Sequence, residues 1–455
     1  MEKRFENRTT WRDYQARFRR ETTLKTLSLR IRRGGLAIGG LLLMFLLAKA
    51  YLVQGNLPPG GETSPEVSSL TADPPDVSEI RKSDIQGWLS PGIVANLEEK
   101  TFDMQVDQDN YRIDTSLDPS LQTSLLKRVR SSDAEQMALV ALDPDDGRVL
   151  AMVGVDQDNL SSNPCFDNHF PAASVFKIVT AAAAIEECDF SLDTTLYYNG
   201  GKYTLYKSQL EDTQNRYTNT ISFRDSFAQS VNPVFGKIGA QYLGYASMSK
   251  YGAAFGFNGA IDFEVSLPSS MFDVSDESYH LAEIACGFNR TTTLTPLHGA
   301  LIAAAVVNDG RLPEPTMIEQ IVDETGREIY CSRPAMAGEA MSPQASELLV
   351  NLMTRTVSSG TCQKTFQSAS KDSVLSKLLI GGKTGSIDNV EHTRRMDWFV
   401  GFAEEKNGSE GIAVAVVVGH GKYIGTRASD FARYAFRDYF KAYFTAADEN
   451  IKQAG

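Results

Sequence analysis

The sequence PAASVFKIVTAAAAI occupies residues 171–185 and predicts a helix that is apolar on almost every side. A helix of this kind belongs at the centre of a domain, where other elements cover all of its faces. Its first turn contains Ser174 and Lys177, which lie three residues apart and therefore on one face. A lysine in this position would be partly desolvated, which lowers its pKa. The segment thus predicts a serine–lysine pair at the start of a central helix.

Strands are predicted on either side of this helix, towards both ends of the chain. Residues 137–142 and 148–154 form a hairpin around the turn at 143–147, and residues 398–403 and 412–419 form a second strand pair. Strands at both ends with helices between them imply an α+β fold, in which an antiparallel sheet is flanked by helices and carries an inserted helical subdomain. Further elements are expected as a strand at 111–113 and helices at 119–130, 174–187, 223–242, 279–286, 295–308 and 429–451.

Charge is divided unevenly along the chain. Residues 1–33 carry eleven Lys or Arg and four Asp or Glu, a net charge of +7, which leaves −19 for the rest of a chain whose total is −12. An acidic body does not suit nucleic acid, because phosphate contacts need clustered Lys and Arg. The five Cys show neither a CxxC pair nor the Cys/His spacing of a zinc site. We therefore expect no nucleic acid, no metal and no cofactor.

An apolar segment follows the basic tail. Residues 36–53 contain a single charge, Lys49, and as a helix these 18 residues extend about 27 Å, just enough to cross a bilayer. By the positive-inside rule, the basic tail stays in the cytoplasm and the body lies outside, in the periplasm. The alternative is a cleaved signal peptide, because residues 48–50 fit a small-x-small cleavage site, although the basic region is very long for one. We expect a retained single-pass anchor in the cytoplasmic membrane.

The chain is expected to divide into five segments. After the anchor comes a stretch rich in Pro, Ser and acidic residues, a composition typical of a linker. The segment between this linker and the main domain is too short for a second large catalytic domain. The expected order is a cytoplasmic tail at 1–33, a transmembrane anchor at 34–53, a linker at 54–85, a short pedestal-like segment at 86–130 and the main domain at 131–448.

The Ser-x-x-Lys pattern at Ser174 is a weak signal by itself, because it also occurs at Ser124, Ser247 and Ser368. Its setting, at the start of an apolar helix, distinguishes the pattern at Ser174 from the others. Two further motifs follow it in order, and the Lys-Thr-Gly sequence within the second occurs only once in the chain. They are Ser230-Val231-Asn232 and Lys383-Thr384-Gly385-Ser386.

This ordered set of motifs resembles the transpeptidase domain of penicillin-binding proteins and the related serine β-lactamases. The resemblance extends beyond the motifs, from about residue 105 to residue 445. The chain departs from the usual pattern at Ala173, where transpeptidases usually have Gly, and at 286–288, where a Gly-Gln-Gly-like stretch is usual. The additional matching segments are 115–122, 139–152, 294–297, 308–310 and 398–402.

The serine and the lysine of the first motif form a nucleophile and its base. A serine hydroxyl is a weak nucleophile until a base takes its proton, and Lys177 can be that base for Ser174 only when it is neutral. An ordinary lysine has a pKa of about 10.4, so burial and the ammonium of Lys383 must lower the pKa of Lys177. By resemblance, Ser230 would relay the proton to the departing amine, and the backbone N–H groups of Ser174 and Ser386 would form the oxyanion hole.

The resemblance also assigns the substrate-binding residues. Asn232 can offer a hydrogen-bond donor and an acceptor to a peptide amide of the substrate. Lys383 and Thr384 would hold the free carboxylate of the substrate's terminal residue. Gly385 would let the substrate backbone lie against the strand, because no Cβ obstructs it.

Together these features imply a membrane-anchored peptidoglycan D,D-transpeptidase. A stem peptide ending in D-Ala-D-Ala would acylate Ser174, and an amine from a neighbouring stem would resolve the ester into a cross-link. Penicillins and other β-lactams would acylate the same serine. The protein resembles a monofunctional, class B type with a reduced pedestal, so a separate glycan polymerase and envelope-assembly proteins are expected partners.

Three alternatives stay open at this point. A D,D-carboxypeptidase uses the same motifs with water as the acceptor. A β-lactamase needs a glutamate for fast deacylation, which has no clear position in the sequence, and Asn232 departs from the Ser-x-Val of class D enzymes. A catalytically weak scaffold is disfavoured by the intact motifs. The flanking residues His169, His392, Arg394 and Arg395 are expected to be solvated, and pairing of Cys165 with Cys188 is left undecided.

Overall fold

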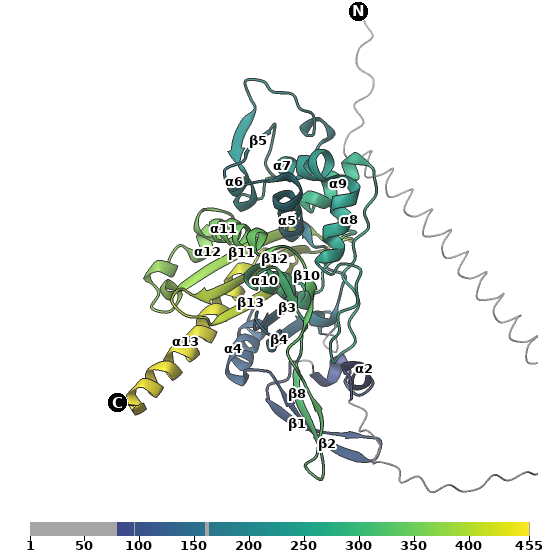
Figure 1. The fold of residues 1–455 in the computed structure, drawn as a ribbon, viewed down its shortest axis with the longest axis vertical. Helices are drawn as coiled ribbons and strands as arrows, with labels where there is room; N and C mark the ends of the chain where they lie inside the picture. Colours follow the sequence, from purple (N-terminus) through teal and green to yellow (C-terminus); the bar gives the residue numbers. More distant parts are fainter. Residues whose placement is uncertain (1–79, 95, 160–162, 455) are drawn as a thin grey trace, which may run out of the picture. The chain divides into compact units, whose positions relative to one another are not determined.

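The centre of the fold is a five-stranded antiparallel sheet with the strand order β11–β12–β13–β3–β4 (Figure 1). It lies within residues 80–94, 96–159 and 163–454, which are the residues that the computed structural model describes. Strand β13 pairs with β3, so strands from the two ends of the predicted main domain lie side by side, which confirms the α+β class. The strands are β3 (Gln136–Leu142), β4 (Val149–Asp156), β11 (Leu378–Asp388), β12 (Arg395–Glu405) and β13 (Gly411–His420).

The predicted tail and anchor, residues 1–53, lie outside the described residues, as does the predicted linker up to residue 79. In the part of the chain that is described, no helix is both long enough and apolar enough to cross a membrane. The end of the predicted linker forms the short helix α2 (Lys82–Ile85), in which Ile85 is fully buried. The five segment boundaries stay predictions.

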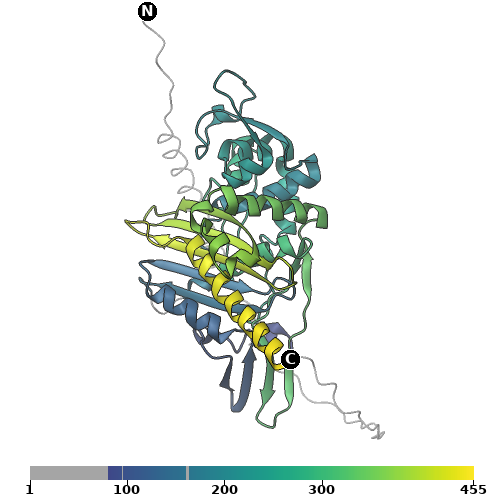
Figure 2. The same ribbon diagram turned by 90° about the vertical axis from the view of Figure 1, so that its left-hand side faces the viewer.

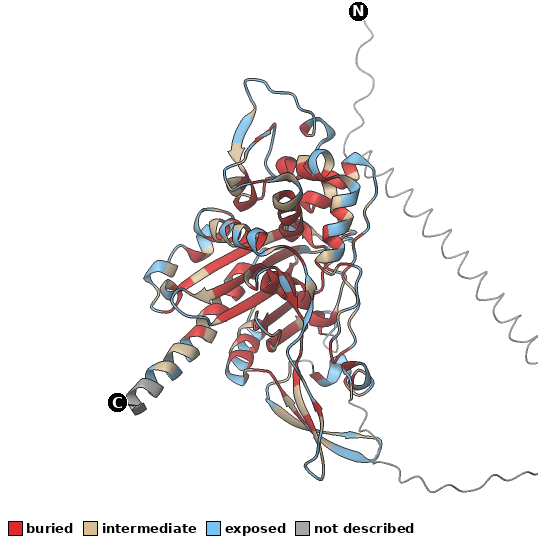
Figure 3. Cartoon of the chain, viewed as in Figure 1, coloured by how far each residue is buried: buried red, intermediate tan, exposed pale blue. Residues whose placement is uncertain are grey.

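Helices cover both faces of the central sheet. On one face lie α4 (Pro119–Arg130) and α13 (Ala428–Ala454), which crosses the strands (Figure 2). Their core includes Leu139, whereas the neighbouring Val140 belongs to the core on the opposite face, with α10 (Pro296–Val307). Successive side chains of a strand point to opposite faces, so covering both faces explains why β3 and β13 are buried throughout and apolar except at Gln136 and His420 (Figure 3).

The residues between β4 and α10 build a mostly helical lobe (Figure 1). Its helix α5 is buried from Lys177 to Ala184, as its apolar sequence predicts. The helix expected at 223–242 needs a correction, because Ser230 has a left-handed φ of 55° and a new helix begins beside Pro233. The lobe contains α5 (Lys177–Cys188), β5 (Thr195–Tyr198), β6 (Asn219–Ser222), α6 (Phe223–Ala228), α7 (Asn232–Lys237), η4 (Ile238–Leu243), α8 (Gly244–Ala254) and α9 (Ser278–Cys286).

A smaller four-stranded sheet, ordered β1–β2–β8–β9, joins distant parts of the chain. Two of its strands come from the predicted pedestal-like segment and two from within the predicted main domain. They are β1 (Thr101–Val106), β2 (Asp109–Thr115), β8 (Ile318–Asp323) and β9 (Glu328–Cys331). The remaining elements are α3 (Pro91–Val94), η1 (Pro164–Phe166), η2 (Ala173–Phe176), η3 (Lys207–Gln209), β7 (Arg311–Pro313), β10 (Met336–Glu339), α11 (Pro343–Ser359), α12 (Gln363–Phe366), η5 (Ala369–Lys371) and η6 (Leu375–Lys377).

One buried tryptophan ties the central sheet to the segment that precedes Ser174. Trp398 lies in β12 with none of its surface exposed, and its indole N–H donates a hydrogen bond to the Pro171 carbonyl at 2.9 Å. The ring of Phe170 meets the Trp398 ring edge to face, with the ring centroids 6.1 Å apart. The position of Ser174 therefore depends on the sheet as well as on its own helix.

Replacing Trp398 by Phe removes this donor and leaves the Pro171 carbonyl without it. We expect Trp398→Phe to lower the free energy of unfolding by about 1–3 kcal/mol, because a buried acceptor loses its partner. Urea unfolding followed by circular dichroism measures the loss. Trp88→Phe is the control, since the half-buried Trp88 stacks on Tyr111 and the substitution keeps a ring there. Equal unfolding midpoints for the two variants would contradict the expectation.

Candidate active site

Ser174 and Lys177 form a hydrogen-bonded pair at the start of α5. Ser174 lies in the turn η2, and the Lys177 Nζ is 2.7 Å from its Oγ. Lys177 is completely buried and also donates to Asn232 Oδ1 at 2.8 Å and to the Cys286 carbonyl at 2.6 Å. A neutral amine has two N–H groups and one lone pair. With the N–H groups directed at Asn232 and Cys286, the lone pair faces the serine hydroxyl.

The second motif connects the first motif to the third. Asn232 reaches Lys177, whereas the Ser230 Oγ accepts a hydrogen bond of 3.0 Å from Lys383 Nζ. Both residues lie in the short connection from α6 into α7. The left-handed backbone at Ser230 lets this connection turn sharply, so the two side chains reach different lysines.

The third motif lies on β11, next to the nucleophile. Lys383 is fully buried and also donates to the Thr384 carbonyl at 2.8 Å. Thr384 and Ser386 are more exposed than Lys383 and Gly385, as the alternation of a strand requires. A Cβ added at Gly385 would lie 3.3 Å from the Ser174 nitrogen. Glycine here thus permits the strand to approach the nucleophile closely.

Burial lowers the pKa of both lysines. The pKa of Lys177 falls to about 8 because its charged form is desolvated. The pKa of Lys383 lies well below its ordinary value, first because of burial and then because of repulsion by Lys177. The two buried amines repel each other, so protonating one makes it harder to protonate the other. Both amines therefore lose their protons more easily than an ordinary lysine does.

The backbone before Ser174 is held in an uncommon conformation. Ala173 has a φ of 49°, in the left-handed region that favours Gly, which is the residue usual in transpeptidases. Gly287 packs directly against this residue, and a Cβ added there would lie 1.8 Å from the Ala173 carbonyl oxygen. The departure from the family pattern at 286–288 therefore still provides a glycine where the nucleophile segment needs one.

The described chain matches the family model of the penicillin binding protein transpeptidase domain over residues 137–438. It belongs to this family. It is 23% identical over 342 residues to Stage V sporulation protein D of Bacillus subtilis, covering 70% of this chain but only 51% of that relative. It is 24% identical to the peptidoglycan D,D-transpeptidase PbpA of Mycolicibacterium smegmatis, covering 69% of this chain and 68% of the relative.

The fold of this penicillin-binding protein family member is also found in solved structures. The penicillin G acyl-enzyme complex of penicillin-binding protein A from Mycobacterium tuberculosis aligns with a TM-score of 0.56 and 22% identity. The alignment covers 73% of this chain and 80% of that structure. This likeness concerns the fold of the two proteins.

Three contacts of the site could not be read from the motifs. The Thr361 hydroxyl lies 2.5 Å from that of Thr384, and the Arg395 Nε donates to Ser386 Oγ at 2.9 Å. The third is the Cys286 carbonyl, which accepts from Lys177. Thr361 follows Gly360, where an added Cβ would lie 2.3 Å from the Ala228 carbonyl oxygen, so this turn packs closely against the end of α6. Arg395 is exposed, as expected, and it also borders the third motif.

The other flanking residues make contacts away from the lysine pair. Arg394 pairs with Glu135 and Asp158, and the His169 Nε2 lies 3.4 Å from Gln136 Oε1. All five cysteines are free, including Cys165 and Cys188. Burial raises the pKa of Cys286 to about 11, so this thiol beside the nucleophile stays protonated at neutral pH.

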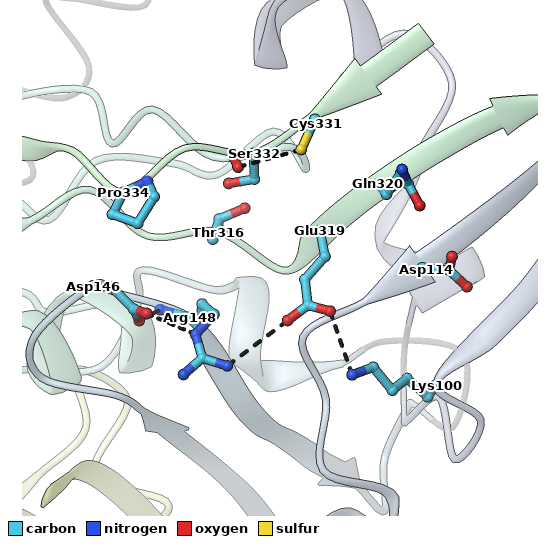
Figure 4. A pocket seen from close by; sticks show the side chains of 10 residues that line it. All are labelled: Lys100, Asp114, Asp146, Arg148, Thr316, Glu319, Gln320, Cys331, Ser332 and Pro334. Atoms are coloured by element: carbon cyan, nitrogen blue, oxygen red, sulfur yellow. Dashed lines mark hydrogen bonds and ion pairs between the residues drawn. The ribbon is translucent and has the colours of Figure 1, made fainter. Parts of the chain in front are cut away.

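A pocket of about 500 Å³ lies at the small sheet and shares no lining residue with this site (Figure 4). Its two cations are paired with its own acidic groups. Lys100 lies 3.3 Å from Glu319, and Arg148 lies 2.7 Å from Asp146. This pocket therefore offers no free charge for a ligand and does not contribute to the catalytic cluster.

The pH dependence of acylation tests the role of Lys177. The base must be neutral, so lowering the pH below a pKa of about 8 should slow acylation by a fluorescent penicillin about tenfold per pH unit. Above that pH the rate should level off. The second-order rate constant between pH 6 and 9 measures this profile. A flat profile would contradict it, and Lys177→Arg, which stays protonated, should acylate very slowly throughout.

The packing of Gly287 gives a second prediction. Gly287→Ala should displace Ala173 and Ser174 and slow acylation by about a hundredfold, because small misplacements of reacting groups are costly. Gly326→Ala is the matched control. Gly326 also has a positive φ, of 84°, but nothing lies within 4 Å of an added Cβ. The control should lose about 1 kcal/mol of stability and keep normal acylation. Equal acylation rates for both variants would contradict the structural account.

Proposed function

We propose that this protein is a serine D,D-transpeptidase that cross-links peptidoglycan stem peptides through an acyl-enzyme on Ser174. The observation that carries the proposal is the hydrogen-bonded cluster of all three motifs, in which Lys177 contacts Ser174 and Asn232, and Lys383 contacts Ser230. Membership of the transpeptidase domain family supports the same reaction. The activity of the named Mycolicibacterium relative is consistent with it.

Acylation begins with proton transfer from Ser174 to neutral Lys177. The Oγ attacks the carbonyl carbon between the two terminal D-Ala residues, and the new C–O bond gives a tetrahedral oxyanion. The backbone N–H groups of Ser174 and Ser386 would be its donors, and the close approach of Gly385 to the Ser174 nitrogen supports this role. When the C–N bond breaks, the departing amine takes a proton, and Ser230 relays it between the lysines and the leaving group.

The two lysines explain how the base is made neutral at the right moment. Before substrate binds, burial lowers the pKa of both amines. A carboxylate bound by Thr384 and Lys383 favours a charged Lys383, because an opposite charge stabilises the ammonium. The repulsion between the amines then favours a neutral Lys177. Binding of the correct terminal carboxylate thus activates Ser174.

The second half-reaction restores the serine. An amine from a neighbouring stem peptide attacks the ester carbonyl, the C–O bond to Ser174 breaks, and the Oγ regains a proton. Among the described residues, the hydrogen-bond partners of Ser174 and Lys177 include an amide and a backbone carbonyl but no carboxylate. This favours a long-lived acyl-enzyme over the rapid hydrolysis of a β-lactamase. Penicillins are expected to remain attached.

The location of the reaction belongs to the same proposal. The apolar segment at 34–53 would anchor the protein in the cytoplasmic membrane, with the basic tail inside and the catalytic domain in the periplasm. The charge division of the sequence supports this orientation. A glycan polymerase and envelope-assembly proteins would be its partners there, because cross-linking needs newly made strands.

A fluorescent penicillin tests the nucleophile. Wild-type protein should be labelled stably, and Ser174→Ala should not be labelled at all. Ser247→Ala is the control, since Ser247 belongs to another Ser-x-x-Lys sequence on α8 and should keep full labelling. Equal labelling of Ser174→Ala and wild type would contradict the assignment. Rapid loss of the label would favour a β-lactamase.

Product analysis separates transpeptidase from carboxypeptidase. Incubation of the full-length protein with peptidoglycan strands carrying pentapeptides should give cross-linked dimers by chromatography of the muropeptides. Lys383→Ala should abolish them, because the terminal carboxylate loses its partner. Trimmed tetrapeptides without dimers would instead establish a D,D-carboxypeptidase.

A further inference from the structure

The exposed tyrosines of the described chain are concentrated on the helical lobe. Six of its seven exposed tyrosines fall between residues 197 and 245, and the seventh, Tyr423, lies between β13 and α13. Exposed aromatic rings are uncommon on a surface that has no partner, because each leaves a large apolar face in water. We call these six the lobe tyrosines. They are Tyr197, Tyr203, Tyr206, Tyr217, Tyr242 and Tyr245.

Two of the lobe tyrosines line a pocket of about 340 Å³ between the β5–β6 hairpin and the α7–η4 helices. Tyr197 and Tyr242 are 41% and 52% exposed, so their rings are available to a ligand. The Tyr242 ring is supported from behind by Phe190, which it meets edge to face at 5.3 Å between centroids. The pocket therefore presents two exposed aromatic rings, of which that of Tyr242 is packed against Phe190.

The rest of the lining combines polar side chains with three aliphatic ones, Leu196, Val234 and Ile238, and carries little net charge. Asn199 bridges the surrounding loop, donating to the Thr213 carbonyl at 2.8 Å and accepting from the Thr218 hydroxyl at 2.9 Å. The one cation that lines it, Lys237, lies 3.1 Å from Asp212. Aromatic faces with a few hydroxyl and amide groups are typical of sites for neutral, polyhydroxylated ligands.

The pocket is joined to the catalytic cluster through α7. This helix begins at Asn232, which contacts Lys177, and ends at Lys237 in the pocket, about 8 Å further along its axis. The loop at 199–218 also reaches from the pocket to the catalytic cluster. Residues of this loop line the pocket, and its Lys202 carbonyl accepts a hydrogen bond of 2.7 Å from the Asn232 N–H. Tyr203 follows Lys202 directly. A ligand could therefore lie across the lobe while a group attached to it occupies the active site.

We propose that the pocket and the lobe tyrosines bind the saccharide chain that carries the stem peptide. This inference rests on the proposed function, which places a peptide from such a chain in the active site. The C–H faces of sugar rings stack on tyrosine rings, and sugar hydroxyl and acetamido groups hydrogen-bond to side chains such as Asn199 and Thr218. The lobe would thus hold the glycan strand and present its stem to Ser174.

Binding of the N-acetylglucosamine tetramer chitotetraose and of peptide-free glycan strands tests the proposal on the full-length protein. Wild type should bind both, and Tyr197→Ala/Tyr242→Ala should bind about tenfold more weakly, because two stacking faces are lost. Tyr197→Phe/Tyr242→Phe keeps the rings and should stay within about twofold of wild type. Tyr423→Ala is the control, an exposed tyrosine outside the lobe that should bind as wild type does.

A comparison of substrates separates this proposal from the proposed function. The alanine variant should show a KM about tenfold higher for glycan-attached pentapeptide but an unchanged KM for the free pentapeptide. Penicillin labelling reports on Ser174 independently, so its absence from wild type would sink the proposed function and not the saccharide site. The saccharide site is overturned if wild type binds no glycan, or if the alanine and wild-type proteins bind it equally. The saccharide site is also overturned if the alanine variant loses binding to a protein partner while its binding to glycan is unchanged.

Discussion

The site depends on one buried amine, that of Lys177. Its nitrogen has hydrogen-bond partners in three different parts of the chain, namely Ser174, Asn232 and the Cys286 carbonyl. A lysine removed from water must either find such partners or give up its proton, and here both occur. The three partners fix the nitrogen in place, while burial lowers its pKa to about 8 and so makes it a usable base.

The fold surrounds this amine with closely packed elements on several sides. The apolar helix α5 carries it into the core, and β11 closes the other side with a glycine against the nucleophile. The segment before Ser174 is held by the hydrogen bond from Trp398 and by contact with Gly287. Close-packed interiors transmit small displacements, so the geometry of the serine depends on residues from distant parts of the sequence.

The elements with strong local patterns were predictable. The hairpin β3–β4, the helix α4 with Pro119 in its first turn, and the apolar helices α5 and α10 follow from periodicity and capping. Pro233 marks a helix start in the sequence, but the left-handed backbone at Ser230 that ends α6 has no signal of its own, because serine rarely adopts it. The pairing of β2 with β8 also escaped prediction, since nothing local specifies a partner some two hundred residues away.

The site shows the same difference between features with a local sequence pattern and features that depend on tertiary packing. The sequence by itself determined the three motifs and their order, because each motif and the apolar surroundings of Ser174 are short runs of consecutive residues. Only the tertiary structure decided that Thr361, Arg395 and the Cys286 carbonyl join the cluster and that both lysines are fully buried. These contacts depend on distances between atoms that are far apart in the sequence and come together only in the fold. A pKa depends on burial and on neighbouring charges, and both exist only once the chain is packed.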